Sequence, residues 1–215
     1  MPRIARIIFN NAICHIFNRG NAKQEVFHDE EDFEHFLYIL AYFKEKYRFK
    51  TYHLCPMPNH FHFLWQISRA KVLSQAMHDI SQTYTKFHHK KYQKVGYLWQ
   101  GRFKNMIVEK EEYLLKLGAY IEKNPVRAGL VKKSEDWKWS SYRFYALGEP
   151  LRVWVKIEGI LKPVDLIDED PLYKNLSQNP IERQKIYREF IEGLNDEKIK
   201  EEFGLKEKRG RPREN

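Results

Sequence analysis

The chain has 215 residues, 42% of them hydrophobic, which is enough for one globular domain with an appendage. Lys and Arg outnumber Asp and Glu by 38 to 29, giving a net charge of +9 and a pI near 9.3 that favours a polyanionic partner. No apolar run reaches the roughly 18 residues of a membrane span, no signal-peptide pattern opens the chain, and the two cysteines form no disulfide framework, so we expect a cytoplasmic protein.

The first part of the chain predicts alternating strands and helices. Residues 4–17 are rich in β-branched and aromatic residues and predict a strand. Acidic residues at 29–32 precede an apolar stripe with spacings of three and four, which predicts a helix ending near Tyr47. Residues 49–55 and 60–67 then predict a hairpin around a proline-containing turn.

Two histidines, His60 and His62, lie one residue apart in the second strand of this hairpin. Side chains at i and i+2 point to the same face of a strand, so the two rings are expected side by side while the alternating aromatic residues face a core. Two imidazoles on one face are a ready pair of metal ligands, although a bare His-x-His is more often structural. His15 is a further candidate ligand, for which a structural or surface role is favoured.

The next elements are an amphipathic helix over residues 72–92, a loop, and a strand over residues 103–108. A last helix is predicted from near Glu111 to Pro125. Tyr120 and Asn124 are four residues apart and share one face of that helix. Tyr113 lies one heptad earlier on nearly the same face and is the rival tyrosine.

Beyond residue 148 the character of the sequence changes. Prolines punctuate residues 150–180, and acidic residues gather there, so a loosely packed, linker-like stretch is expected. Residues 182–194 and 196–203 predict two short helices. The chain ends in a charged segment with the composition of a disordered tail. We therefore predict a domain over residues 1–148 and a mostly helical extension over residues 149–215.

These motifs carry a resemblance to a known family. His60-Phe61-His62 resembles the His-hydrophobic-His motif of single-tyrosine HUH transposases. Residues 98–104 (LWQGRFK), 120–131 and 139–143 (WSSYR) resemble the REP-associated branch of that family. The similarity covers roughly the first 150 residues, and the motifs are specific as an ordered set. It implies an α+β, ferredoxin-like antiparallel sheet with helices on one face.

The resemblance also implies a chemistry. Tyr120 would be the catalytic nucleophile, and His60, His62 and Asn124 would bind a divalent metal, Mg²⁺ or Mn²⁺. Insertion-sequence relatives often carry Gln as the third ligand, and Asn124 matches the REP-associated branch. Such an enzyme cleaves single-stranded DNA through a 5′-phosphotyrosine intermediate and rejoins strands, with hairpins of palindromic repeats as substrates.

Basic residues supply candidate DNA contacts. Four of them lie in the family motifs: Arg102, Lys104, Arg127 and Arg143. Two more, Arg209 and Arg211, lie in an Arg-Gly-Arg-Pro run that resembles the AT-hook. Arg127 could equally hold the helix end to the domain. The expected partner is single-stranded or hairpin DNA, bound by a monomer or a homodimer in the cytoplasm or on the nucleoid. The alternatives are a non-catalytic nucleic-acid-binding module of the same fold and a metal-dependent nuclease that uses water.

Overall fold

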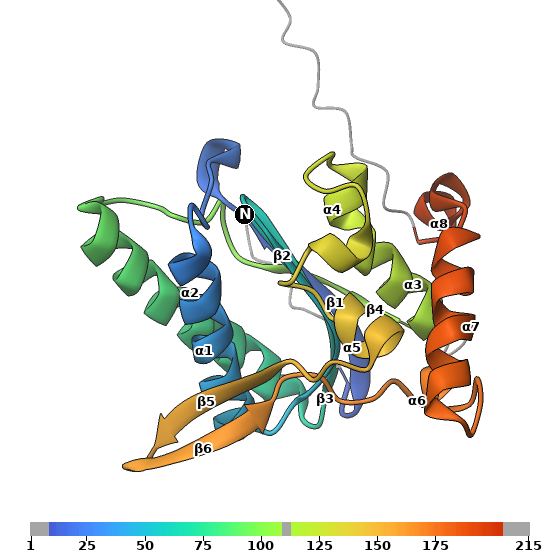
Figure 1. The fold of residues 1–215 in the computed structure, drawn as a ribbon. Helices are drawn as coiled ribbons and strands as arrows, with labels where there is room; N and C mark the ends of the chain where they lie inside the picture. The colour runs from blue at the N-terminus through green and yellow to red at the C-terminus, as the bar shows by residue number, and fades with distance from the viewer. Residues whose placement is uncertain (1–8, 109–112, 204–215) are drawn as a thin grey trace, which may run out of the picture.

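The computed structural model describes residues 9–108 and 113–203. Its centre is a four-stranded antiparallel sheet in the order β2-β3-β1-β4 (Figure 1). The strands are β1 (Ala12–Arg19), β2 (Lys50–Met57), β3 (His60–Ile67) and β4 (Lys104–Ile107). With one helix after β1 and another after β3, this is the ferredoxin-like order, so the predicted α+β class and antiparallel sheet are confirmed.

The first strand begins later than predicted. Asn11 adopts a φ of 61°, which makes a turn just before β1. Residues 4–8 of the predicted strand lie outside the described residues. The strand then continues two residues past its predicted end at residue 17, because Asn18 and Arg19 pair with the start of β3.

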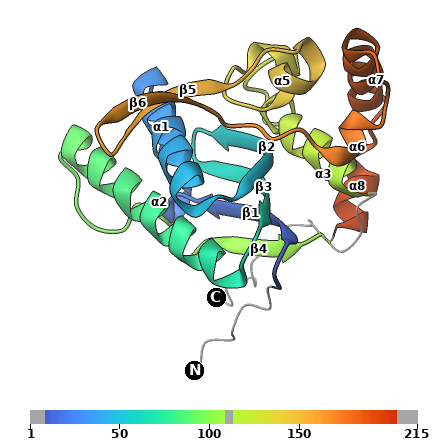
Figure 2. The ribbon, with the colours of Figure 1, turned by 90° about the horizontal axis from the view of Figure 1, so that it is seen from below.

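Two helices, α1 (Glu30–Tyr47) and α2 (Ala70–Tyr92), cover one face of the sheet (Figure 2). Asp29 caps α1 by accepting a hydrogen bond from the Asp32 N–H at 3.1 Å, and the helix ends at Arg48 in the left-handed region. The aromatic residues that alternate with the histidines of β3 are fully buried beneath these helices; they are Phe61, Phe63 and Trp65. This face is the main hydrophobic core, as the strand alternation predicted.

A third helix adds a layer on the opposite face of the sheet (Figures 1 and 2). Helix α3 (Tyr113–Glu122) is followed after Lys123 by the single turn α4 (Asn124–Arg127). The predicted stop at Pro125 is wrong, because Pro125 lies in the first turn of α4, where its missing N–H costs no helical hydrogen bond. The predicted start near Glu111 lies outside the described residues. Helix α3 buries Leu117 and Ile121 in a second apolar cluster with Leu64 of β3.

A buried polar network lies where α3 meets β2. The imidazole of His53 is fully buried between the carboxylates of Glu122, at 2.8 Å, and Asp170, at 3.2 Å. Gly118 of α3 lies directly over this ring, and a Cβ there would be 2.3 Å from His53 Nε2. Helix α3 therefore packs this close to the sheet only because residue 118 has no side chain.

The C-terminal region is more ordered than the sequence suggested. Its elements are the short 3₁₀ helix η2 (Ser134–Asp136), α5 (Tyr142–Leu147), β5 (Arg152–Ile157), β6 (Ile160–Asp165), α6 (Pro171–Lys174), α7 (Pro180–Glu192) and α8 (Asp196–Glu202); η1 (Asn21–Lys23) precedes α1. The linker-like stretch predicted over residues 150–180 is wrong, because β5 and β6 form a hairpin and α6 follows it. The two predicted late helices are confirmed as α7 and α8.

The extension shares its core with the rest of the chain. Val155 of β5 and Val164 of β6 are buried in the same apolar cluster as α1. Lys44 of α1 forms an ion pair with Asp168 at 2.6 Å, and Tyr187 of α7 donates to Glu122 of α3 at 2.8 Å. The division at residue 148 stays a prediction. None of the helices in the described part is both long and apolar enough to cross a bilayer.

Candidate active site

The two histidines of β3 lie side by side. The ring centroids of His60 and His62 are 5.0 Å apart and the rings are perpendicular, as the two-residue period of a strand predicted. Leu64 continues the same row and packs against α3, so this is the face that the third helix covers. The histidine pair therefore opens toward the helix that carries Tyr120.

Burial keeps both imidazoles neutral. It lowers the pKa of His60 to about 4, with a further contribution from the charge of Arg19. It lowers the pKa of His62 well below the ordinary value, and the charges of His15, His60 and Arg127 add to this effect. Neutral imidazole has the lone pair that a metal ion needs, so at neutral pH both rings are in the ligating state.

Each ring is held through its Nδ1 atom. Asn59 Oδ1 lies 2.6 Å from His60 Nδ1, and His15 Nε2 lies 2.9 Å from His62 Nδ1. These contacts leave the two Nε2 atoms without a hydrogen bond to any described residue. A ligating histidine whose other ring nitrogen is hydrogen-bonded is the usual arrangement in metal sites, so this pair fits a divalent metal.

His15 is placed differently from what the sequence favoured. It is buried, with 1% of its surface exposed, and its ring stacks on His62 at 5.1 Å between centroids. The alternation of side chains along β1 puts His15 and Phe17 on one face of the strand. The pairing of Phe17 with His62 across β1 and β3 shows that this is the face of the histidine pair. The surface role is therefore wrong for His15, which lies next to the histidine pair.

Tyr120 and Asn124 share a third partner, Arg127. The Arg127 guanidinium lies 3.7 Å from the centroid of the Tyr120 ring. Its Nη2 donates to the backbone oxygen of Tyr120 at 2.8 Å and to Asn124 Oδ1 at 2.5 Å. Asn124 Nδ2 in turn donates to the Ile121 carbonyl at 3.0 Å. Tyr120 of α3 and Asn124 of α4 thus both contact one guanidinium, although they do not lie in one helix as predicted.

The Tyr120 helix contacts the sheet through an apolar cluster that includes the next residue in the histidine row. Tyr120, with 9% of its surface exposed, belongs to the same buried cluster as Leu64. Arg127 is close enough to lower the pKa of His62 through its charge. No group of three or more His, Cys, Asp or Glu side chains in the described part of the chain forms a metal site by itself. Asn124 as the third protein ligand stays a prediction.

The candidate DNA contacts lie in four different places along the chain. Arg102 and Lys104 are exposed, and Lys104 Nζ lies 5.9 Å from the Phe17 ring, which is itself 5.8 Å from the His62 ring. Arg143 lies on α5 in an ion pair with Glu149 at 2.7 Å. Arg127 is held internally, also by Asp196 of α8 at 3.4 Å, which is the alternative the sequence left open. Arg209 and Arg211 lie outside the described residues.

Arg19 is a basic residue that sequence reasoning missed. It pairs with His60 across β1 and β3, and its guanidinium donates to Gln100 Oε1 from Nε at 3.2 Å and from Nη2 at 3.1 Å. Gln100 belongs to the LWQGRFK motif, so the motif holds a cation beside the histidine pair. The register of two strands distant in sequence was needed to find it.

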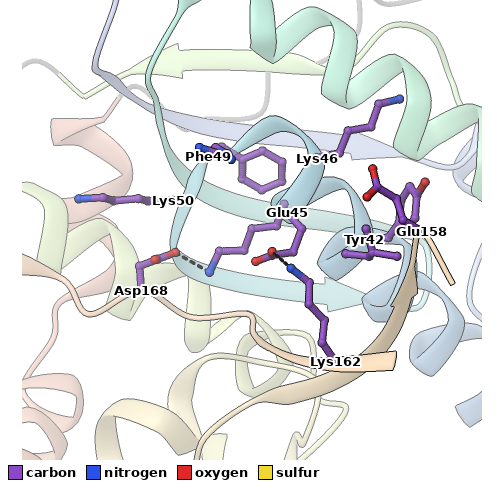
Figure 3. A pocket seen from close by; sticks show the side chains of 11 residues that line it. Tyr42, Glu45, Lys46, Phe49, Lys50, Glu158, Lys162 and Asp168 are labelled. Carbon is purple, nitrogen blue, oxygen red and sulfur yellow. Dashed lines mark hydrogen bonds and ion pairs between the residues drawn. The ribbon is translucent and has the colours of Figure 1, made fainter. Parts of the chain in front are cut away.

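A cavity of about 750 Å³ lies elsewhere, where the end of α1 meets the β5–β6 hairpin (Figure 3). The strand β2 starts at its edge with Lys50 and ends at Met57 beside His60, which puts the cavity roughly 20 Å from the histidines. Two of its cations are neutralised, Lys44 by Asp168 and Lys162 by Glu45. The cavity is therefore separate from the candidate site.

Comparisons with known proteins give the family and support the fold. Residues 8–124 match the family model described as transposase IS200 like. A curated relative from Haemophilus influenzae, named as a REP-associated tyrosine transposase, is 29% identical over 109 residues, which are 46% of this chain and 61% of that protein. The chain thus spans less than two thirds of that relative's length. A solved structure of a REP-associated tyrosine transposase bound to a REP hairpin matches with a TM-score of 0.58 and 19% identity, covering 68% of this chain and 86% of the other.

Proposed function

Because this chain belongs to the IS200-like transposase family, we propose that it is a metal-dependent endonuclease and strand-transferase for single-stranded DNA. The observation that carries the proposal is the placement of the Tyr120 helix over the face of the sheet that holds two neutral, adjacent imidazoles. The resemblance read from the motifs is confirmed by the family match. The reaction and its residues are proposals.

His60, His62 and Asn124 are the proposed ligands of one Mg²⁺ or Mn²⁺ ion. Two imidazole nitrogens and one amide oxygen suit Mn²⁺ better than Mg²⁺, because Mg²⁺ prefers oxygen ligands. When bound, the ion supplies Lewis-acid polarisation of the scissile phosphate. The burial that keeps His60 and His62 neutral also keeps both available as ligands at neutral pH.

Tyr120 is the proposed nucleophile. Its hydroxyl oxygen forms a bond to phosphorus as the bond from phosphorus to the 3′-oxygen breaks, which yields a 5′-phosphotyrosine and a free 3′-OH. The proton lost by the phenol is gained by the leaving 3′-oxygen. One phosphoester replaces another, so the reverse step joins strands without an external energy source. Tyr113, the rival, packs against Phe203 at the far end of α3 with its ring 5.2 Å away.

The proposed substrate is a hairpin of palindromic DNA. The solved relative was bound to a REP hairpin, and this chain shares its fold. Half-buried Arg19 and exposed Lys104 lie near the histidine pair in positions suited to phosphate contacts, and exposed Arg102 precedes Lys104 by two residues. A chain with a net charge of +9 also favours any nucleic acid through counterion release.

The test is incubation with an end-labelled single-stranded hairpin oligonucleotide and Mn²⁺, followed by a denaturing gel. Wild-type protein should give a cleaved strand and a labelled protein band, and EDTA should abolish both. Tyr120→Phe removes one oxygen, so folding and DNA binding should persist while cleavage and the labelled band disappear. Tyr113→Phe is the matched control on the same helix and should keep most of the activity.

The other outcomes separate the alternatives. A labelled band that persists in Tyr120→Phe and vanishes in Tyr113→Phe would assign the nucleophile to Tyr113. Cleavage without a labelled band from any variant would identify a hydrolytic nuclease that uses water. DNA binding without cleavage under any metal would leave a binding module of the same fold.

A further inference from the structure

Both site histidines are held through Nδ1, one by an amide and one by a second imidazole. Asn59 Oδ1 faces His60 at 2.6 Å, and His15 Nε2 faces His62 at 2.9 Å. A neutral imidazole carries one proton, and only the nitrogen without it can bind a metal. The group that faces Nδ1 therefore decides whether Nε2 is available to an ion.

The orientation of the Asn59 amide determines the tautomer of His60. Asn59 Nδ2 donates to the carbonyl oxygen of Lys23 at 3.3 Å, so Oδ1 is the amide atom that faces the ring. An amide oxygen only accepts hydrogen bonds, so His60 Nδ1 carries the proton. The lone pair of His60 is consequently on Nε2.

The contact between His15 and His62 permits two proton arrangements. His62 Nδ1 can donate to His15 Nε2, or His15 Nε2 can donate to His62 Nδ1. Only the first arrangement leaves a lone pair on His62 Nε2, and it places the proton of His15 on Nδ1. That buried Nδ1 has no hydrogen-bond partner among the described residues, and an unpartnered buried N–H is unfavourable. An ion bound at His62 Nε2 would offset this penalty and select the first arrangement.

We propose that Asn59 and His15 are positioning residues that present Nε2 of His60 and of His62 to one divalent cation. His15 accepts the Nδ1 proton of His62 whenever the ion is bound. This inference rests on the metal site of the proposed function and extends it to two residues that hydrogen-bond the proposed ligands. His15 is thus a third imidazole of the site, which hydrogen-bonds a proposed metal ligand and does not itself bind the ion.

The tautomers can be read directly by NMR. In full-length protein labelled with ¹⁵N-histidine, long-range ¹H–¹⁵N correlation spectra distinguish a protonated from a bare ring nitrogen. We expect the His60 proton on Nδ1 with and without metal. With diamagnetic Mg²⁺ added, we expect the protons of His62 and His15 on Nδ1 as well. A proton on Nε2 of His62 in the Mg²⁺-bound protein, or on Nε2 of His60 in either state, overturns the inference.

Metal affinity supplies a second measurement that needs no DNA. Asn59→Ala and His15→Phe each remove an acceptor, so the affinity for Mn²⁺ in a calorimetric titration should fall about 10–100-fold. Asn59→Asp keeps an acceptor oxygen at the same distance and should keep most of the affinity. His78→Gln is the control, because His78 is an exposed histidine of α2, with 58% of its side chain accessible.

The outcomes distinguish this inference from the function on which it rests. Unchanged Mn²⁺ affinity in both Asn59→Ala and His15→Phe overturns the positioning role. Wild-type protein that binds no Mn²⁺ overturns both the positioning role and the metal site. Loss of cleavage alone, with the tautomers and affinities as expected, overturns only the proposed reaction. If His15→Phe does not fold, the Asn59 pair and the wild-type spectra decide the question.

Discussion

The Arg127 side chain contacts the proposed nucleophile, the proposed third metal ligand and an acidic residue of α8 at the same time. Its guanidinium stacks on the Tyr120 ring, donates to Asn124 Oδ1, and forms an ion pair with Asp196. The planar fork of arginine is needed for this set, because lysine has neither the stacking surface nor the spread of donors. We therefore expect Arg127 to hold the nucleophile and the proposed third ligand in register, rather than to clamp a phosphate.

This expectation separates rate from binding. Arg127→Met keeps most of the stem and removes the donors, so single-turnover cleavage should fall by roughly 10–100-fold because the Tyr120 hydroxyl is misplaced. DNA affinity should change little, and its dependence on salt should keep its slope. Affinity measured over a series of NaCl concentrations, together with the cleavage rate, tests both statements. Arg152→Gln, which removes an exposed ion-paired arginine of the β5–β6 hairpin, is the control.

The opposite pattern would assign Arg127 to the DNA. A lost phosphate contact lowers the salt slope by roughly one unit and weakens binding without a specific effect on the chemical step. Arg127→Met with a smaller slope and an unchanged single-turnover rate would contradict the internal role.

At the scale of elements, the local sequence pattern was sufficient to predict those helices and strands whose contacts are between residues close in sequence. The β2–β3 hairpin and the two faces of β3 follow from a period of two, and α1, α7 and α8 from a period of 3.6. His15 and Arg19 could not be placed in this way, because the register between β1 and β3 joins residues more than 40 positions apart. Their identity as neighbours of His62 and His60 is a property of the sheet.

The β5–β6 hairpin was missed for a different reason. Pro163 lies within β6 and argued against a strand, and the apolar residues Trp154 and Leu161 point outward rather than into a core. The sequence nonetheless contained one local signal for a hairpin, the glycine at position 159. In the structure Glu158 and Gly159 form the two-residue turn and both have positive φ, at 51° and 86°.

Helix α8 is the element that links the extension to the candidate site. Ile199 is buried in the same cluster as Tyr120, Asp196 pairs with Arg127, and Glu202 lies 3.6 Å from Lys116 of α3. Burial of one Ile side chain stabilises by about 1.5–3 kcal/mol, and the partly exposed pair of Lys116 with Glu202 adds little. The apolar contact is therefore the larger part of what α8 contributes to α3.

Two truncations separate α8 from the basic tail that follows it. A chain that ends after Gly193 should unfold at a lower temperature and cleave more slowly, because the Tyr120 cluster is opened. A chain that ends at Leu205 should keep the chemistry but bind DNA more weakly and with a smaller salt slope, since Arg209 and Arg211 are removed. Melting curves, cleavage rates and salt series on both chains give the answer. If the chain that ends at Leu205 and the full chain have equal DNA affinity and equal salt slope, the tail is irrelevant to binding.

Across the whole molecule, one buried charge network joins the sheet, the Tyr120 helix and the extension. Burial alone would lower the pKa of His53, but hydrogen bonds to Asp170 and Glu122 outweigh it and raise the pKa to about 9. Ser141 and Tyr187 also donate to Glu122, at 2.5 Å and 2.8 Å. The imidazolium thus forms ion pairs with two carboxylates that are fully buried.

Stability should therefore depend on pH above neutrality. The folded state keeps the His53 proton up to about pH 9, whereas the unfolded chain loses it near 6.5, so the contribution is complete below pH 6.5 and is lost as pH rises to about 9. A shift of this size corresponds to roughly 3 kcal/mol. The free energy of unfolding by urea, measured from pH 6 to 9.5, should show this decline in wild type and a flatter profile in His53→Gln. Parallel profiles for the two proteins would contradict the assignment.

The bare backbone of Gly118 sets the reach of the proposed nucleophile. Tyr120 lies two residues farther along α3, about 3 Å along the helix axis. A side chain at residue 118 that pushed the helix away from the sheet would therefore also move the Tyr120 ring. A methyl group there would meet His53 at 2.3 Å, and a displacement near 1 Å at a reacting atom can cost about a hundredfold in rate. The position of the proposed nucleophile thus depends on a residue without a side chain, which packs on the buried ring of His53.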